Sequence, residues 1–442
     1  MKAKLPNQSV PTPKDTEIKR LLIANPSLGM GTCKEIIKSL TFKSEDEKEK
    51  ICSLLEETLS VFKKKARKIN EDSQKESLFK QMNKHIEQWE EEFGEVNLSD
   101  IQLLTESTDI KLLDVAWKQE KLTPYSISQL LDEYMVGQDE YKQELGLTFF
   151  IHLLRMHKPN LNIPKSNLLV YGQTGVGKTS GAKLLADKLG VDYGILNFER
   201  LVAEGIQGAK ITDPFTRVLG EKKDNMILIG DEVDKIHEEE IRQELLSILD
   251  DKNVISFPTT FGVYREYREV PSKNITCVLC GKFDSITKTV EKRLDAKKIG
   301  FSSEKSKEFS TGELYAHATL KDLKEVLGSD EICGRIGNFV SVRPLSGDDF
   351  VKILLSKKDS IIRRYQSFFS ENNVKLEITK GGAEQIAGFA SLRYEELGVR
   401  GLEIVIRQIL KSSMLRVDTL KGRTIILDKY FVNSHIKDEE KF

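Results

Sequence analysis

The chain has 442 residues, 39% of them hydrophobic and 31% charged, so it is long enough for two or three domains with their own cores. Its formal net charge of −1 argues against a general nucleic-acid binder, because binding a phosphate backbone needs a concentrated excess of Lys and Arg. No apolar run approaches the roughly 20 residues of a membrane span, and the opening residues lack the apolar core of a secretory signal.

The first 121 residues predict a helical N-terminal region. Residues 1–30 are interrupted by Pro, Ser and Asn, which predicts a partly loose segment. Apolar residues then recur at helical spacing over 51–69 and again over 78–93, which predicts an antiparallel helical hairpin within residues 46–95. The two apolar stripes either pack on each other or bind a partner, and the sequence leaves both readings open.

Residues 122–340 show a different pattern, in which short apolar runs alternate with helical segments. Near-continuous apolar runs of this kind are typical of buried parallel strands joined by crossover helices, so the predicted fold class is α/β with a parallel sheet. Residues 341–442 are mostly helical, with one strand-like run at 423–432, and predict a smaller second domain. The predicted strands of the sheet are NLLVY (167–171), YGILNF (193–198), MILIG (226–230) and ITCVLC (275–280).

The five cysteines are odd in number and widely spaced, which is typical of a reducing cytoplasm rather than of a disulfide framework. Cys277 and Cys280 lie within an apolar strand-like run, and no second Cys or His pair stands at zinc spacing. We therefore predict buried thiols in a cytoplasmic protein.

A phosphate-binding loop follows the first predicted strand and begins a helix. Glycines at this spacing let backbone N–H groups surround a phosphate, and the helix N-terminus adds favourable dipole charge. Lys178 is expected to reach the β and γ phosphates of ATP, and the Thr179 hydroxyl to bind Mg²⁺. The residues assigned to nucleotide binding in this loop are Gly172, Gln173, Thr174, Gly175, Val176, Gly177, Lys178, Thr179 and Ser180.

Two carboxylates follow the strand-like run at 226–230. Asp231 is placed to bind Mg²⁺, and Glu232 is placed to activate a water molecule for attack on the γ phosphate. Gly230 stands in a slot that is normally apolar, so we expect it to weaken this strand end slightly. Together with the phosphate-binding loop, these residues predict an ATPase.

From about residue 122 to 432, the chain resembles the ClpX family of AAA+ unfoldases, and HslU more distantly. The resembling stretches are LTPYSISQLLDEYMVGQDEYKQ, GQTGVGKT, LIGDEVDKI, EICGRIGNF and LGVRGLEIVIRQIL. The resemblance implies a P-loop AAA+ αβα domain, a small helical lid after it, and a homo-hexamer acting on protein substrates with ATP and Mg²⁺. It also implies that Val136 lies beside the adenine, that Arg335 is an arginine finger and that Arg400 is the sensor-2 arginine of the lid.

Two further stretches correspond to functional loops of that family. EGIQGAK falls where the family carries its pore loop, so Gly205, Ile206, Gln207 and Gly208 are the pore-loop candidates, with Ile206 in place of a gripping tyrosine. The tripeptide at 299–301 is similar to the loop that docks a ClpP-like peptidase; its residues are Ile299, Gly300 and Phe301. Each loop has a plainer reading, as a connection or as part of the core.

The chain departs from the family at its N-terminus, where neither CxxC pair of the family's zinc-binding domain is present. The leading prediction is an ATP-dependent protein unfoldase, with a ClpP-like peptidase as an expected partner. The alternative is a hexameric switch ATPase that remodels or signals to a protein partner without threading polypeptide. A DNA-acting motor is disfavoured by the neutral charge and by the lack of nucleic-acid-binding motifs in the sequence.

Overall fold

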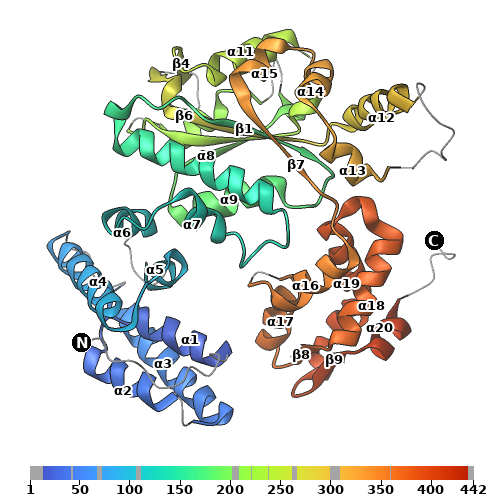
Figure 1. Ribbon diagram of the computed structural model, residues 1–442. Coiled ribbons are helices and arrows are strands. Elements are labelled where there is room, and N and C mark those ends of the chain that lie inside the picture. The colour runs from blue at the N-terminus through green and yellow to red at the C-terminus, as the bar shows by residue number, and fades with distance from the viewer. Residues whose placement is uncertain are drawn as a thin grey trace. The chain divides into compact units, whose positions relative to one another are not determined.

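The computed structural model describes residues 13–40, 43–66, 72–105, 111–201, 209–220, 222–236, 238–260, 266–298, 309–358 and 360–436. The chain divides into two compact units. Residues 1–130 with 188–190 form the first unit, and residues 131–187 with 191–442 form the second. Figure 1 shows the elements of both.

The first unit is helical, and its first helix was not expected from the sequence. Residues 13–23 form α1, in which Ile18, Leu22 and Ile23 are fully buried, so the prediction of a loose segment is wrong for this stretch. Pro13 is tolerated because it stands in the first turn, where a helical N–H has no partner. The helices are α1 (Pro13–Ile23), α2 (Met30–Leu40), α3 (Glu45–Ala66), α4 (Asp72–Phe93), α5 (Leu98–Thr105), α6 (Leu112–Lys118) and α7 (Pro124–Gln129).

The two helices of the predicted hairpin are α3 and α4, and α1 packs against both of them. A ring nitrogen of His85 in α4 lies 3.3 Å from the carbonyl oxygen of Leu22 in α1. Trp89 is fully buried on the same face of α4, and its ring lies 4.6 Å from that of Phe93. Helix α1 therefore packs mainly on α3, and α4 contacts both α1 and α2, so the stripes have partners that the sequence did not predict.

The second unit is built on a five-stranded parallel sheet in the order β2-β3-β6-β1-β7, which confirms the predicted α/β class. The strands are β1 (Asn167–Gly172), β2 (Tyr193–Asn197), β3 (Met226–Asp231), β6 (Ile275–Gly281) and β7 (Gly337–Val342). The sequence missed β7, an edge strand that begins at a glycine and is only partly buried. It also missed the antiparallel pair β4 (Val254–Pro258) and β5 (Tyr267–Pro271).

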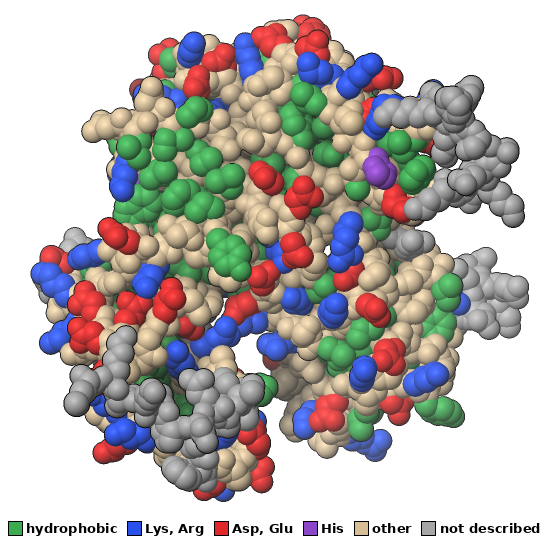
Figure 2. Space-filling view, in the orientation of Figure 1, with side chains coloured by type: hydrophobic (Ala, Val, Ile, Leu, Met, Phe, Trp, Pro, Cys, Tyr) green, Lys and Arg blue, Asp and Glu red, His purple; other side chains and the backbone are tan. Residues whose placement is uncertain are grey.

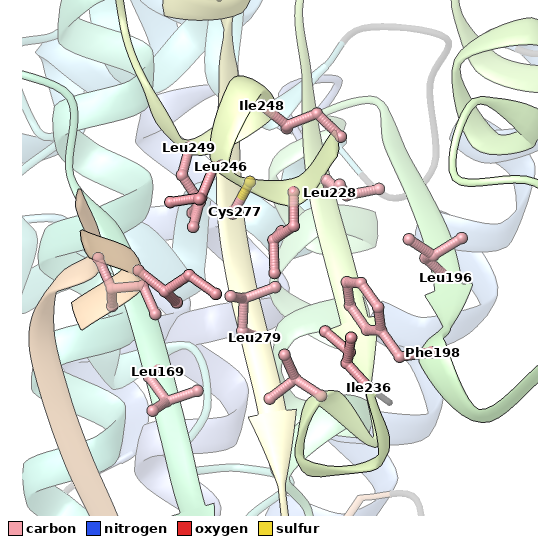
Figure 3. Packing of buried hydrophobic residues seen from close by; sticks show 14 of the residues in the cluster. Leu169, Leu196, Phe198, Leu228, Ile236, Leu246, Ile248, Leu249, Cys277 and Leu279 are labelled. Carbon is pink, nitrogen blue, oxygen red and sulfur yellow. The ribbon is translucent and has the colours of Figure 1, made fainter. Parts of the chain in front are cut away.

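Helices cover the sheet on both faces, as Figure 1 shows. On one side, α8 packs on β1 and β7; on the other, α11 packs on β6, and α15 on β1 and β7. Leu169 of β1, Leu228 of β3 and Leu279 of β6 point into a core that Leu246 and Leu249 of α11 complete (Figure 3). The helices are α8 (Asp139–His157), α9 (Lys178–Leu189), α10 (Asp213–Val218), α11 (Glu239–Leu249), α12 (Asp284–Lys298), α13 (Thr311–Ala316), α14 (Leu320–Leu327) and α15 (Asp330–Ile336), with 3₁₀ turns η1 (Pro159–Leu161), η2 (Phe198–Arg200), η3 (Val233–Lys235) and η4 (Ser272–Asn274).

The C-terminal part of this unit is mostly helical, as predicted, and contains a two-stranded parallel sheet. The run predicted as one strand at 423–432 is half strand and half helix. Asp428 ends the strand by capping the next helix, because its side chain accepts a hydrogen bond from the Phe431 N–H at 2.7 Å. The elements are α16 (Gly347–Ser356), α17 (Ile361–Glu371), β8 (Lys375–Ile378), α18 (Lys380–Tyr394), η5 (Glu395–Leu397), α19 (Val399–Leu415), η6 (Val417–Leu420), β9 (Thr424–Leu427) and α20 (Lys429–His435).

Acidic and basic side chains are interspersed over the face in Figure 2. In the part of the chain that the structure describes, no helix combines the length and the apolar character needed to cross a membrane. All five cysteines are unpaired, as the sequence predicted, and all are buried, as it predicted for Cys277 and Cys280.

Candidate functional site: a nucleotide cleft between sheet and lid

A cleft of about 640 Å³ lies where the carboxyl ends of β1, β6 and β3 meet. These strands are neighbours and parallel, so the segments that follow them share one edge of the sheet. Residues of the C-terminal part, including Arg400, line the cleft from the other side. The predicted site residues brought together here are Val136, Thr174, Gly175, Val176, Gly177, Lys178, Thr179, Ser180, Asp231, Glu232 and Arg400.

The glycines of the phosphate-binding loop are required by its backbone. Gly172, Gly175 and Gly177 have φ angles of 131°, 71° and 101°, a region that residues with a Cβ rarely adopt. A Cβ at Gly172 would lie 2.6 Å from the carbonyl oxygen of Val342, and one at Gly175 would collide with the carbonyl of Leu397. The loop therefore lies too close to Val342 and Leu397 for a side chain at Gly172 or Gly175, and Gly175 and Gly177 line the cleft.

Lys178 begins α9 and is held against the loop. Its Nζ donates hydrogen bonds to the carbonyl oxygens of Gly172 at 2.7 Å and Gln173 at 2.6 Å. The side chain is 8% exposed, and burial lowers the pKa of its amine. The Tyr141 hydroxyl, buried in α8, donates to the carbonyl oxygen of Lys178 and fixes the first turn of α9. Gly172 and Gln173 thus serve this site through carbonyls that bind the lysine.

The donor set in the cleft fits Mg²⁺ and ATP. Thr179 offers a hydroxyl and Asp231 a carboxylate, which are the hard oxygen ligands that Mg²⁺ prefers. The Asp231 carboxylate also accepts the backbone N–H of Glu232 at 3.1 Å. Glu232 itself has a φ of 59°, an uncommon left-handed conformation for a residue with a side chain.

Glu232 has a partner that the sequence reading missed. The Nδ2 of Asn197, the last residue of β2, donates to Oε2 of Glu232 at 2.9 Å. Asn197 stands beside Asp231 in the sheet register, so strand pairing brings its amide next to the glutamate. The chain then passes through η2 to Leu201, which forms an isolated β-bridge with Ala209.

The lid contacts the phosphate-binding loop directly. The backbone N–H of Val399, the first residue of α19, donates to the carbonyl oxygen of Gly175 at 2.9 Å. The Thr174 hydroxyl donates to the carbonyl oxygen of Glu396 at 3.2 Å. Arg400 therefore enters the cleft from a helix whose first turn is bonded to the loop.

The segment before α8, which carries Val136 and Gln138, is joined to the end of β7. The side chain of Gln138 donates to the carbonyl oxygen of Arg343 at 2.7 Å and accepts its N–H at 3.0 Å. This pair holds the segment that carries Val136, which is 8% exposed and lines the cleft. These two hydrogen bonds thus connect the segment before α8 to the start of the lid.

Comparison with known proteins agrees with this geometry. Residues 168–300 match the ATPase family associated with various cellular activities (AAA). The chain is 30% identical over 349 residues to the ATP-dependent Clp protease ATP-binding subunit ClpX of Treponema denticola, covering 72% of this chain and 83% of the relative. The chain belongs to the ClpX family. Two proteins of the same name are also similar. The one from Porphyromonas gingivalis strain ATCC 33277 is 26% identical over 351 residues, and the match covers 73% of this chain and 85% of the relative. The one from Bacteroides thetaiotaomicron is 29% identical over 334 residues, and the match covers 69% of this chain and 80% of the relative.

This ClpX-family protein is therefore an ATPase, and the family uses ATP with Mg²⁺. The cleft also contains a lysine that the sequence did not predict as a site residue. Lys282 follows β6 and lines the cleft, and its N–H donates to Oδ1 of Asp234 at 3.2 Å. The other oxygen of Asp234 accepts the Phe283 N–H at 3.1 Å, so this carboxylate fixes the turn that carries Lys282.

Gly230 of this ClpX-family ATPase does not leave a gap in the strand. A Cβ at this position would lie 2.6 Å from the ring of Phe198 and 2.8 Å from Leu279. The Phe198 ring, 2% exposed, occupies the space of the missing side chain. The expected weakening of this strand end is therefore offset by packing.

One predicted catalytic residue lies away from the cleft, and the structure does not describe two predicted loops. Arg335 is absent from the described residues that line the cleft. Helix α15 ends near the amino ends of the strands, beside the start of β1, whereas the cleft lies at their carboxyl ends. The pore-loop candidates at 205–208 and the docking tripeptide at 299–301 lie outside the described residues. Their assignments stay predictions.

Proposed function

We propose that this ClpX-family ATPase is a hexameric protein unfoldase whose lid moves with the nucleotide in the cleft. The observation that supports this most is the contact between the phosphate-binding loop and the lid, from the Val399 N–H to the Gly175 carbonyl at 2.9 Å. A ligand at this loop bears directly on the first turn of α19, and through it on the lid. The proposed domains are a helical N-terminal region (1–121), the AAA+ nucleotide-binding domain (122–340) and the lid (341–442). The proposed location is the cytoplasm.

The proposed division of labour follows from the positions of the side chains. Lys178 binds the β and γ phosphates, and Thr179 with Asp231 holds Mg²⁺, which neutralises phosphate charge when bound. Glu232 accepts the proton of the attacking water, and Asn197 orients its carboxylate. Arg400 contacts the phosphates from the lid and couples them to its position.

Arg335 is proposed to act on the ATP of a neighbouring subunit. A guanidinium that stabilises transition-state charge in trans makes hydrolysis depend on assembly. Its position away from its own cleft supports this role. An apolar area over α8, visible in Figure 2, supports self-association: Leu147 is 38% exposed, and Phe150, Ile151 and Leu154 are partly exposed.

The loop between Leu201 and Ala209 is proposed to grip the polypeptide. The bridge between these two residues closes the base of the loop, and the same segment begins at Asn197 beside Glu232. The base of the loop is thus connected through Asn197 to the residue proposed to activate water. Isoleucine at 206 offers less contact area than an aromatic ring, so the grip is expected to be weaker than that of a tyrosine.

We expect Ile206→Ser to lower unfolding of a tagged fluorescent protein several-fold while ATP hydrolysis continues, because the apolar contact with substrate is lost. Ile206→Tyr serves as the matched variant and is expected to preserve or improve unfolding. The measurement is loss of fluorescence beside the ATPase rate. Wild-type unfolding by Ile206→Ser would favour the alternative, a switch ATPase that remodels a partner without threading it.

The tripeptide at 299–301 is proposed to dock a ClpP-like peptidase. We expect Phe301→Ala to abolish ATP-dependent capture of the protein on an immobilised peptidase, because six loops bind together and their avidity multiplies the loss of each contact. ATPase activity is expected to stay at the wild-type level. A parallel loss of ATPase activity would instead assign Phe301 to the core.

A further inference from the structure

The guanidinium of Arg335 is bonded within its own chain. Nη1 donates to the carbonyl oxygen of Leu246 in α11 at 2.8 Å. Nη2 donates to Oε1 of Glu331, one turn earlier in α15, at 2.6 Å, and lies 3.4 Å from Oδ2 of Asp250. The Arg335 side chain is 29% exposed, so this cluster is at the surface.

We propose that Asp250 and Glu331 hold Arg335 in an inactive position within its own chain, and that Arg335 acts on a neighbouring subunit only after its Nη2 leaves both carboxylates. This inference rests on the proposed function, because it takes Arg335 as the arginine that completes a neighbour's site. Asp250 and Glu331 are then positioning residues, which control when the guanidinium of Arg335 is released from its own chain.

The reason lies in the shape of the guanidinium. It binds a phosphate best through two parallel N–H groups, either from Nη1 and Nη2 or from Nε and Nη2. Both arrangements use Nη2, the nitrogen that faces Glu331 and Asp250. A phosphate therefore competes with the two carboxylates, which would also repel it if they stayed beside the arginine.

The backbone beneath Arg335 is fixed, so the side chain is the part free to move. Asn167, 1% exposed, donates through Nδ2 to the carbonyl oxygens of Arg335 at 3.0 Å and Leu249 at 3.1 Å. Its Oδ1 accepts the N–H of Cys277 at 3.0 Å. This amide joins the ends of α15 and α11 to the sheet, so rotation about the Arg335 side-chain bonds is the simplest route to release.

Asp250 is itself held in place as a charged partner. Its Oδ1 accepts the N–H of Lys252 at 2.8 Å, which leaves Oδ2 toward Arg335. This backbone hydrogen bond, with a contribution from the charge of Arg335, lowers the pKa of Asp250. Because the cluster is partly exposed, its ion pairs are weak enough to break in the working cycle.

The test uses mixed rings of two variants, and the further substitutions are made only in the subunit that donates the arginine. Donor subunits carry Glu232→Gln and supply Arg335 without hydrolysing ATP; acceptor subunits carry Arg335→Ala and have an intact cleft. Adding Asp250→Asn or Glu331→Gln to the donor is expected to raise the ATP turnover of the mixture about two- to fivefold, the range of an exposed ion pair. The ATP concentration at half-maximal rate is expected to stay unchanged, because the acceptor cleft is unaltered.

The matched control is Asp330→Asn in the donor. Asp330 precedes Glu331 in α15 but pairs with Lys324 at 3.1 Å, so its loss is expected to leave turnover unchanged. If the mixture recovers activity but Asp250→Asn and Glu331→Gln leave its ATP turnover equal or lower, the proposal that these carboxylates hold Arg335 inactive is wrong. If co-assembled mixtures recover no activity even with unaltered donors, the role of Arg335 in trans fails instead.

Discussion

Glu232→Gln is expected to lower ATP turnover by about 10²- to 10⁴-fold while ATP still binds, because the amide cannot accept the proton of the attacking water. The change keeps the size of the side chain and its bond from Asn197, which donates at 2.9 Å in the native chain. Steady-state hydrolysis, measured beside binding of a fluorescent ATP analogue, checks both halves of the expectation.

Lys178→Ala is the contrasting variant, and it is expected to lose nucleotide binding itself. Its amine is anchored by the carbonyls of Gly172 and Gln173 at the mouth of the phosphate-binding loop, where no other side chain of the loop offers a cation. Turnover by Glu232→Gln within a few-fold of wild type would refute the assignment of the base.

Arg335→Ala is expected to lower turnover of the assembled protein by about 10³- to 10⁵-fold, the range known for an arginine finger. ATP binding is expected to persist, because Arg335 is absent from the described lining of its own cleft. Steady-state hydrolysis and analogue binding measure the two effects, with size-exclusion chromatography to establish assembly.

Arg416→Ala is a suitable control, since it removes an exposed arginine that follows α19 and is absent from the described lining of the cleft. Its turnover is expected to match wild type. Full activity of an assembled Arg335→Ala protein would show that neighbouring subunits hydrolyse ATP without this arginine.

The sequence predicted the features of this fold that local patterns encode. The four apolar runs of the sheet and the phosphate-binding loop each carry their signal within about ten residues, and the structure has them where they were expected. The edge strand β7 carries no such signal, since it starts with Gly337 and Asn338 and is only partly buried. The sequence does not predict α1, because Pro, Ser and Asn recur through residues 1–30 and are typical of a loose segment.

The residues of the candidate site also fall into those that local motifs predict and those that they do not. Lys178, Asp231 and Glu232 belong to recognisable motifs. Asn197, in contrast, reaches Glu232 only because β2 pairs with β3, and Lys282 reaches the cleft because β6 lies between β3 and β1. Strand order is set by long-range packing, which one sequence does not reveal. An asparagine at the end of a predicted strand was the only local signal available.

The packing of Phe198 against Gly230 has a consequence for how this protein can change over evolutionary time. A side chain added at Gly230 would strike the ring, 2.6 Å from a new Cβ, and a smaller residue at Phe198 would leave a cavity in the core. Each single replacement is therefore costly, although a small residue at 198 with an aliphatic one at 230 would fill the same space once Leu279, 2.8 Å from the new Cβ, also shifts. A lineage that has reached this pairing is held in it, because the first step toward the other solution passes through a less stable protein.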